Sequence, residues 1–213
     1  MTPEHAQARC GQTTSSEFKS VLAKGEGKTR SAYLRRVVAE MLTGKPVEIN
    51  VGRARAHLDR GNEQEPFGRM AYEAATGNLV EQVEFIPHPT IAAGCSPDGL
   101  IDDDGGLELK SVIPTVQVDT ILGGGYPSEH RAQVQGNLWI TNRQWWDFAS
   151  YSPDMPGKLK LYIFRVRRDE DYIRKLEAEV TAFVREAQEL RDRLLRGDDL
   201  EGALRASLAK VAA

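Results

Sequence analysis

The sequence predicts a single α/β domain. The chain has 213 residues, of which 40% are hydrophobic, and a domain of this size buries an adequate core. Residues 94–113 show the pattern of a β-hairpin, and residues 169–195 follow the period of a long amphipathic helix. We see no internal repeat and no linker, so we expect one domain over residues 1–213.

The first part of the chain is expected to be helical. Over residues 13–22, Thr14 or Ser15 can cap a helix that has Glu17 in its first turn. Residues 31–42 carry an apolar stripe at the helical period, and a glycine and a proline follow as stop signals.

The middle of the chain mixes all three kinds of structure. Residues 66–75 predict a third helix that begins at its proline and ends before Gly77, and residues 80–86 alternate imperfectly as a strand. Residues 114–127 predict a loop, because they contain Gly123–Gly125 and Pro127. The glycines lack the following Gly-Lys-Ser/Thr of a phosphate-binding loop, so a mobile loop is the better interpretation.

The hairpin lies between these segments and the C-terminal half. Its parts are a strand over 94–101, a turn over 102–106 and a return strand over 107–113. Glu108 and Lys110 are two residues apart, so they project from one face of the return strand, and Asp98 lies early on the other strand. Two carboxylates and one ammonium are therefore expected in a small volume.

The C-terminal half predicts helices and strands in alternation. Residues 128–140 and 169–195 are expected to be helices, 145–151 and 159–166 strands, and 198–213 a short terminal helix. The aromatic residues of the two strands fit the core, and a platform for stacking bases is the alternative.

The hairpin carries the chemistry of a metal-dependent hydrolase. Two carboxylates suit Mg²⁺ or Mn²⁺, and a lysine beside them can position a water or stabilise negative charge. This combination favours metal-assisted phosphodiester hydrolysis. Two simpler interpretations stay open: Asp98 belongs to an ordinary Pro-Asp-Gly turn, or Glu108 and Lys110 form a solvated strand face.

Four ordered segments resemble one family, that of phage lambda exonuclease, also called YqaJ-type viral recombinases. The hairpin contributes SPDGL and then LELK, with ten residues from Asp98 to Glu108. The other three segments are RCGQTTSSEF (9–18), GNEQEPFGRMAYEAATG (61–77) and HRAQVQGNLWITNRQWWDFASYSPDM (130–155). The resemblance covers roughly residues 5–190.

The resemblance implies a fold and an architecture. The family belongs to the PD-(D/E)XK nucleases, so we expect a restriction-endonuclease-like core with a central mixed β-sheet flanked by helices. Residues 1–213 would form a single lambda-exonuclease-like domain.

The resemblance also implies roles for the hairpin residues and their neighbours. Asp98, Glu108 and the backbone carbonyl of Leu109 would ligate the metal. Glu65 would hold a second metal or its water, although a first-turn glutamate favoured by the helix dipole is the simpler alternative. Lys110 would orient the attacking water.

Glutamines and hydroxyls complete the implied site. Gln133 would hydrogen-bond the attacking water or the lysine, and Gln135 would contact DNA; alternatively both face solvent. Arg9, Thr14 and Ser16 match positions that line a 5′-phosphate pocket, where an arginine fork and hydroxyls near a helix N-terminus suit an anion. Both hydroxyls are also natural helix caps. Ser96 could join this pocket.

The implied function is a Mg²⁺-dependent 5′→3′ exonuclease, with Mn²⁺ as a substitute and one or two ions. It would degrade one strand of linear double-stranded DNA from a 5′-phosphorylated end, release 5′-phosphomonoester products and leave 3′ tails for phage-type recombination. The implied partners are a single-strand annealing protein and two further copies in a homotrimeric ring. The alternatives are an endonuclease or branched-DNA nuclease, and a non-catalytic DNA-end-binding protein.

Composition limits the setting. A net charge of −3 and a pI of about 5.9 argue against a non-specific DNA coat, but local basic patches can coexist with an acidic site. A patch, or else a set of solvated helix faces, is expected from Lys24, Lys28, Arg30, Arg35, Arg36, Arg53, Arg55 and Arg60.

The remaining signals favour the bacterial cytoplasm. The sequence has two cysteines, Cys10 and Cys95, which imply no disulfide framework. Iron–sulfur relatives of the implied fold need four cluster cysteines, so we do not expect this chain to be one of them. The start of the chain lacks a signal sequence, and no apolar run approaches a membrane span. We therefore expect a phage- or prophage-encoded cytoplasmic enzyme.

Overall fold

The computed structural model describes residues 3–23, 28–47 and 52–197, with the backbone alone for residues 52–62. The main sheet has the order β4-β5-β6-β7, formed by Gly99–Ile101, Gly105–Ser111, Trp145–Tyr151 and Leu161–Arg167. β5 and β6 are parallel and the other two pairs are antiparallel, so the sheet is mixed. A smaller sheet has the order β1-β3-β2, from Thr13–Thr14, Ala93–Cys95 and Ile86–Pro87.

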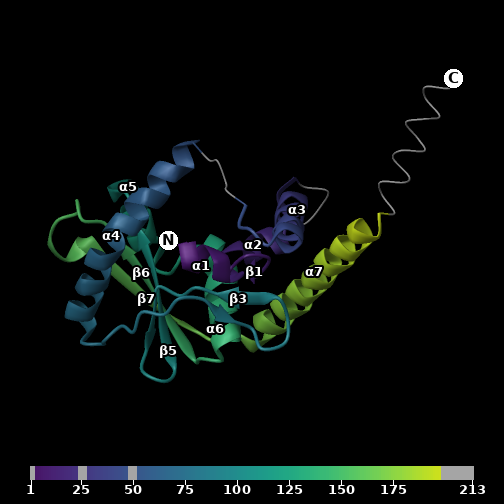
Figure 1. The fold of residues 1–213 in the computed structure, drawn as a ribbon. Helices are drawn as coiled ribbons and strands as arrows, with labels where there is room; N and C mark the ends of the chain where they lie inside the picture. Colours follow the sequence, from purple (N-terminus) through teal and green to yellow (C-terminus); the bar gives the residue numbers. More distant parts are fainter. Residues whose placement is uncertain (1–2, 24–27, 48–51, 198–213) are drawn as a thin grey trace.

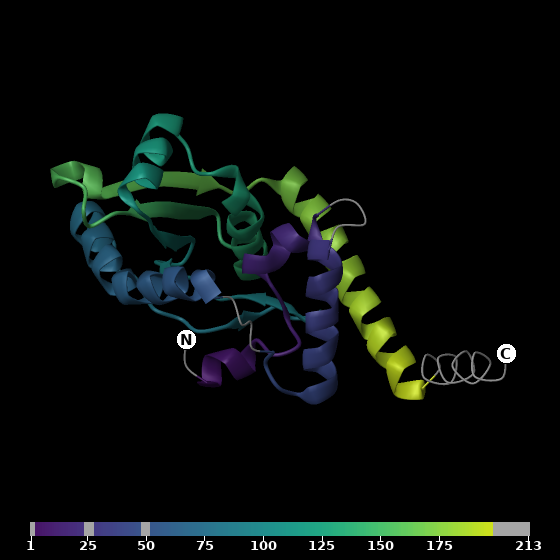
Figure 2. The same cartoon turned by 90° about the horizontal axis from the view of Figure 1, so that it is seen from above.

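Helices cover both faces of the main sheet. The α-helices are α1 (Pro3–Ala8), α2 (Phe18–Val21), α3 (Lys28–Thr43), α4 (Gly52–Thr76), α5 (Pro114–Gly123), α6 (Arg131–Thr141) and α7 (Glu170–Arg196). Short 3₁₀ turns are η1 (Ser15–Glu17), η2 (Ser128–His130) and η3 (Gly157–Lys160). Figure 2 shows the sheet between α4 on one side and α5 on the other. The expected mixed sheet flanked by helices is confirmed.

The alternation of side chains along β5 divides the interior into two parts. Leu107 and Leu109 face α4, in a cluster with Tyr72 and Trp145. The opposite face of the sheet holds Trp146 and Phe148, which join the larger core under α3, α6 and α7 (Figure 1). Glu108 and Lys110 alternate with the leucines, so their side chains lie on this second face.

Close packing explains two glycines near the site. A Cβ on Gly106 would lie 2.4 Å from the ring of Trp146, its partner across the β5–β6 pair. A Cβ on Gly68 would lie 2.7 Å from Leu109, so this glycine lets α4 approach β5. Both positions need a residue without a side chain because interiors are already packed to high density.

Long, regular elements agree with the sequence. The strand predicted over 145–151 is β6, and the strand predicted over 159–166 is β7 with slightly shifted ends. The helices predicted over 31–42, 128–140 and 169–195 correspond to α3, η2 with α6, and α7. The terminal helix predicted over 198–213 lies outside the described residues.

Two helix predictions were wrong in their bounds. Residues 13–22 begin as β1, because Thr13 and Thr14 pair with β3, and become helical only afterwards. The helix predicted over 66–75 begins at Gly52, so Pro66 lies inside α4. An interior proline removes a helix hydrogen bond, and α4 is visibly bent (Figure 2).

The mobile loop predicted over 114–127 was wrong for residues 114–123, which form α5, whereas residues 124–127 lie outside any helix or strand. Pro114 occupies the first turn of α5, and Gly124, one of the glycines that suggested a loop, closes the helix in the left-handed conformation. Gln117 is buried and donates to the carbonyls of Ser150 and Leu159, at 3.2 and 3.0 Å, which fixes α5 to the sheet.

The strand predictions before the site need two corrections. Residues 80–86 form only a single bridge, Glu81 with Leu100, before β2 begins at Ile86. The strand predicted over 94–101 is broken into β3 and β4, which belong to different sheets.

No described helix is both long enough and apolar enough to span a membrane.

Asp169 caps the N-terminus of α7 and gives a stability prediction. Its Oδ1 accepts from the Tyr172 N–H at 3.0 Å and its Oδ2 from Arg131 at 2.8 Å. The backbone hydrogen bond, followed by Arg131, lowers the pKa of this carboxyl below its ordinary 3.8. We expect Asp169→Ala to reduce the free energy of unfolding by about 1 kcal/mol at neutral pH.

The pH dependence of that loss follows from the sign of the shift. A lowered folded-state pKa means that the contribution is complete above the unfolded-state pKa and is lost as the pH falls through the folded-state value. Urea unfolding should therefore show the deficit at pH 7 and a smaller one in strong acid. Asp169→Asn, which keeps a good cap, is the control; an equal loss in both variants would contradict the capping role.

Candidate active site

Strand pairing brings Asp98 to Glu108. Gly99 is paired with Leu107 in the antiparallel β4–β5 ladder, so one further step of the same register sets residue 98 opposite residue 108. Asp98 lies at the break between β3 and β4, and its Oδ2 accepts from the Leu109 N–H at 2.6 Å. In an antiparallel pair, the N–H and the C=O of one residue point to the same neighbouring strand. The Leu109 carbonyl is therefore directed toward Asp98, as its N–H is.

Glu108 is a buried carboxylate whose two oxygens are both engaged. It is 1% exposed, and its Oε1 lies 2.5 Å from the Lys110 ammonium and 2.6 Å from Gln133 Nε2. Its Oε2 accepts from Asn137 Nδ2 at 3.1 Å. A buried charge is tolerated when it is paired and hydrogen-bonded in this way. Gln133 thus contacts Glu108 directly rather than facing solvent.

Asn137 is a site residue that the sequence reasoning missed. It follows Gln133 by four residues on α6, so the two side chains share one helix face. That spacing was the available signal, but a buried asparagine is indistinguishable in sequence from a solvent-facing one.

The buried surroundings and the neighbouring Glu108 change the pKa of Asp98. Burial, and then the negative charge of Glu108, raises the pKa of Asp98 to about 8. Burial by itself lowers the pKa of Lys110, but the charges of Glu108 and Asp98 outweigh it and the pKa is raised. Lys110 therefore stays an ammonium, and a cation bound beside Asp98 would offset the effects that raise its pKa.

The donor set fits a hard divalent cation. Asp98, Glu108 and the Leu109 carbonyl are oxygen ligands, the type that Mg²⁺ and Mn²⁺ take, and the repulsion between the carboxylates is what a cation would relieve. Within the described ranges, no three His, Cys, Asp or Glu side chains already converge as a complete ligand set. A bound ion would take its further ligands from a backbone carbonyl and water.

Glu65, on α4, lines a cleft together with Asp98. Its Oε1 accepts from Arg69 at 3.2 Å, and its charge adds to the forces that raise the pKa of Asp98. It lies inside α4 rather than in a first turn, so the alternative of a dipole-stabilised terminal glutamate was wrong. Glu65 and Asp98 line one cleft of about 530 Å³.

Arg9 also lines this cleft, and it contacts a hydroxyl cluster formed by Thr14 and Ser16. The Arg9 guanidinium donates to Thr14 Oγ1 at 3.4 Å and to Ser16 Oγ at 3.2 Å. Arg9 and Ser96 line the cleft together with Asp98, and Ser96 Oγ lies 2.9 Å from His5 Nε2. The Thr14 hydroxyl does not cap the following turn, and both hydroxyls accept from the arginine.

Gln135 is placed elsewhere. It is 2% exposed, its Nε2 donates to the Arg167 carbonyl at 2.9 Å, and its Oε1 accepts from the Asp169 N–H at 3.0 Å. It therefore joins α6 to the end of β7 and the start of α7. Its side chain lies away from that of Gln133, because α6 turns residues 133 and 135 to different sides, and the DNA contact expected for Gln135 stays a prediction.

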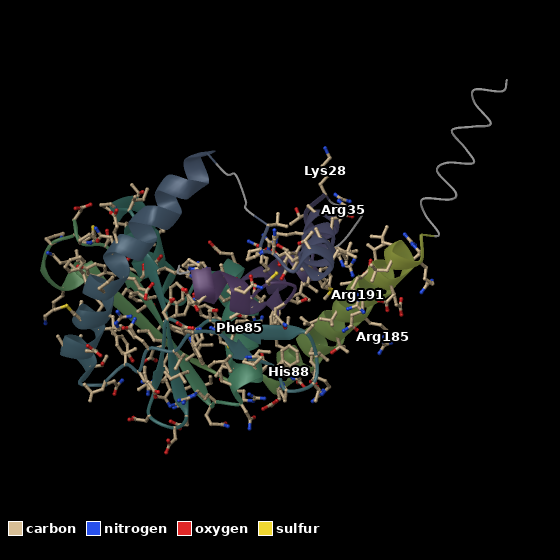
Figure 3. All side chains as sticks on the ribbon, in the orientation of Figure 1. Lys28, Arg35, Phe85, His88, Arg185 and Arg191 are labelled. Atoms are coloured by element: carbon tan, nitrogen blue, oxygen red, sulfur yellow. The ribbon has the colours of Figure 1, made fainter. Side chains whose placement is uncertain are left out.

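The expected basic patch is only partly visible. Lys28 and Arg35 project outward from α3 (Figure 3), whereas Arg30 and Arg36 pair with Glu186 and Glu17. The side chains of Lys24, Arg53, Arg55 and Arg60 lie outside the described part of the chain.

Comparisons with known proteins agree with this fold. The YqaJ-like viral recombinase domain matches residues 4–144. The crystal structure of an alkaline exonuclease, LHK-Exo from Laribacter hongkongensis, matches with 35% identity and a TM-score of 0.85 over 93% of this chain and 98% of that one. Its complex with dAMP matches at 34% identity, with the same TM-score and the same coverage.

More distant matches add less. A phage-related exonuclease from Haemophilus somnus 129PT shares 13% identity with a TM-score of 0.63, over 86% of this chain and 96% of that one, which supports the fold alone. The uncharacterised protein ExoD of Escherichia coli (strain K12) is 33% identical over 70 residues, 32% of this chain and 79% of ExoD. Fold and site together define the class of the protein as a nuclease of the exonuclease type. More specifically, the chain belongs to the YqaJ-like viral recombinase family.

The placement of Gln135 gives a prediction that separates structure from DNA contact. Gln135→Ala leaves two backbone groups without their partners, so we expect the free energy of unfolding to fall by roughly 1–3 kcal/mol. Affinity for DNA ends should not change, since both amide atoms are engaged away from the cleft. Denaturant unfolding and end-binding titrations test this; weaker binding at unchanged stability would contradict it.

Proposed function

We propose that this protein is a Mg²⁺-dependent 5′→3′ exonuclease that degrades one strand of linear double-stranded DNA from a 5′-phosphorylated end. The observation that carries the proposal is the shared cleft, which Arg9, Ser96 and Asp98 line together. Family membership and the likeness to solved exonucleases support a DNA exonuclease in recombination. The 3′ tails left by the reaction would be substrates for strand annealing.

The proposed metal ligands are Asp98, Glu108 and the Leu109 carbonyl, with Glu65 for a second ion or its water. Mg²⁺, or Mn²⁺ in its place, supplies neutralisation of phosphate charge and a more acidic bound water. The chain contributes the fixed positions of these oxygens: the Leu109 N–H orients Asp98, and Gln133 and Asn137 orient Glu108.

Lys110 is proposed as the charged donor of the site. Glu108 holds its ammonium at the edge of the buried core, with 30% of the lysine side chain exposed. From there it can donate to the attacking water and to the developing negative charge on the phosphate. Gln133 acts through Glu108 and is a positioning residue in this proposal.

The polarity follows from anchoring a terminal phosphate. The guanidinium of Arg9 and the hydroxyls of Thr14 and Ser16 suit phosphate oxygens, and Ser96 can add a further hydroxyl. If the 5′-phosphate is held there, the next phosphodiester lies toward the carboxylates, and the product is a 5′-mononucleotide. LHK-Exo has been crystallised in complex with dAMP, which is a nucleoside monophosphate and fits such a product.

The proposed assembly and setting come from the family. A homotrimeric ring around DNA would make degradation processive, and a single-strand annealing protein would take up the exposed strand. A phage- or prophage-encoded enzyme would work in the cytoplasm of the bacterial host.

The activity is tested on DNA with defined ends. We expect Mg²⁺-dependent loss of the 5′-phosphorylated strand of linear duplex, slower loss from 5′-hydroxyl ends and none from circles. Lys110→Ala should lower the rate by roughly 10²–10³-fold, since it removes a charged donor. Lys158→Ala, at an exposed lysine of η3, is the matched control.

Each other outcome of this assay has a meaning. Equal cutting of circles would make the protein an endonuclease, and degradation from the 3′ end would overturn the proposed polarity. Binding of ends without any cleavage in Mg²⁺ or Mn²⁺ would favour the non-catalytic alternative.

Metal binding is tested without activity. Excess Mg²⁺ should raise the melting temperature, because a ligand that binds only the folded state stabilises it, by about 2.7 kcal/mol at a hundredfold excess over Kd. Asp98→Asn should abolish most of this shift, while Asp119→Asn at an exposed position of α5 should keep it. Equal shifts in both variants would exclude Asp98 as a ligand.

A further inference from the structure

A buried chain of hydrogen bonds runs to Glu108 from Ser15, which lies between the two residues of the hydroxyl cluster. Ser15 Oγ lies 2.6 Å from Asn137 Oδ1, and Asn137 Nδ2 lies 3.1 Å from Glu108 Oε2. The three residues are 2%, 0% and 1% exposed, so water does not compete for these bonds. Ser15 and Asn137 are 122 positions apart in the sequence.

Chemistry fixes the direction of both bonds. The ionised carboxylate of Glu108 can only accept, so Asn137 must present its NH₂ group to it. The amide oxygen of Asn137 then faces Ser15, whose hydroxyl must donate. The asparagine therefore has one satisfied orientation, and that orientation depends on Ser15.

Ser15 stands between the two hydroxyls that face Arg9. Thr14 and Ser16 direct their side chains to the guanidinium, while Ser15 directs its own inward. The segment is also fixed along its backbone, because Thr14 is paired with Gly94 in β3 and its N–H donates to the Tyr33 hydroxyl at 3.0 Å. The hydroxyl cluster is thus held rigidly.

Gly136 permits the contact between this segment and α6. A Cβ at residue 136 would lie 2.5 Å from the Phe18 ring and 3.3 Å from Ser15 Cβ. The turn η1 can therefore lie directly on α6, one residue away from Asn137. The same helix presents Gln133 to the other oxygen of Glu108.

We propose that Ser15 and Asn137 are positioning residues that fix the distance between the 5′-phosphate pocket and Glu108. A terminal phosphate held by Arg9 would then set the next phosphodiester against the carboxylates, and the phosphate would raise turnover as well as affinity. This proposal rests on the proposed function. It adds that the Ser15–Asn137 pair transmits end recognition to the catalytic carboxylate.

Gln133 separates this role from simple support of the carboxylate. It donates to Glu108 at 2.6 Å and makes no hydrogen bond to Ser15. Removing it should disturb Glu108 for every kind of DNA end. Removing the Ser15 hydroxyl should instead reduce the advantage that a 5′-phosphate gives.

The test compares kcat and KM on duplexes with 5′-phosphate or 5′-hydroxyl ends. Ser15→Ala should lower the phosphate-to-hydroxyl ratio of kcat roughly tenfold, because small misplacements of reacting groups are costly. Gln133→Ala should lower kcat on both ends and leave the ratio within about twofold. Tyr72→Phe, which removes a buried hydroxyl bond to Asp147 under the opposite face of the sheet, should lower only the melting temperature.

The outcomes distinguish the two proposals. A wild-type preference for 5′-phosphate that Ser15→Ala retains would overturn the positioning role and leave the proposed function intact. A wild-type enzyme without any such preference would overturn both. Should Ser15→Ala fail to fold by circular dichroism, Asn137→Ser removes the amide that spans the two sides, and an unchanged ratio in that variant would equally overturn the role.

Discussion

The burial of one negative charge is the constraint on which this structure depends. Glu108 lies on a central strand with almost no contact with water, and an unpaired carboxylate in such a place would be prohibitively costly. The compensation comes from Lys110 on the same strand and from two amides of α6. The position of α6 over β5 is therefore set by charge compensation as well as by apolar packing.

The strand β5 serves two interiors at once. One side carries leucines that pack under α4, and the other carries the charged residues of the site. The period of two makes this division inevitable, since a shift by one residue would exchange the two sets. Gly105 and Gly106, lying against Trp145 and Trp146, hold the register at the start of the strand because no other residue fits there.

The sequence predicted the features that depend on local periodicity or spacing. The strand β6 and the helix α7 followed from their repeats, and Asp98, Glu108 and Lys110 from the hairpin. It did not predict what depends on distant partners. The strand β1 exists because of β3, Gln135 turns toward a helix start, and Asn137 gains its role from Glu108 and Ser15. The helix α5 was missed for a different reason, since its boundary residues are the same ones that build loops.

The order in which the chain is made bears on when this site can exist. Asp98, Glu108 and Lys110 are close in sequence and are synthesised together. Two of the three side chains that bind Glu108 belong to α6, which is made later. Asn137, the partner of Ser15, follows it by 122 positions. Contacts of such separation are slow to form, because they require the closure of a long loop. A growing chain therefore contains the complete motif well before it contains an organised site, and degradative activity would be deferred until most of the domain has left the ribosome.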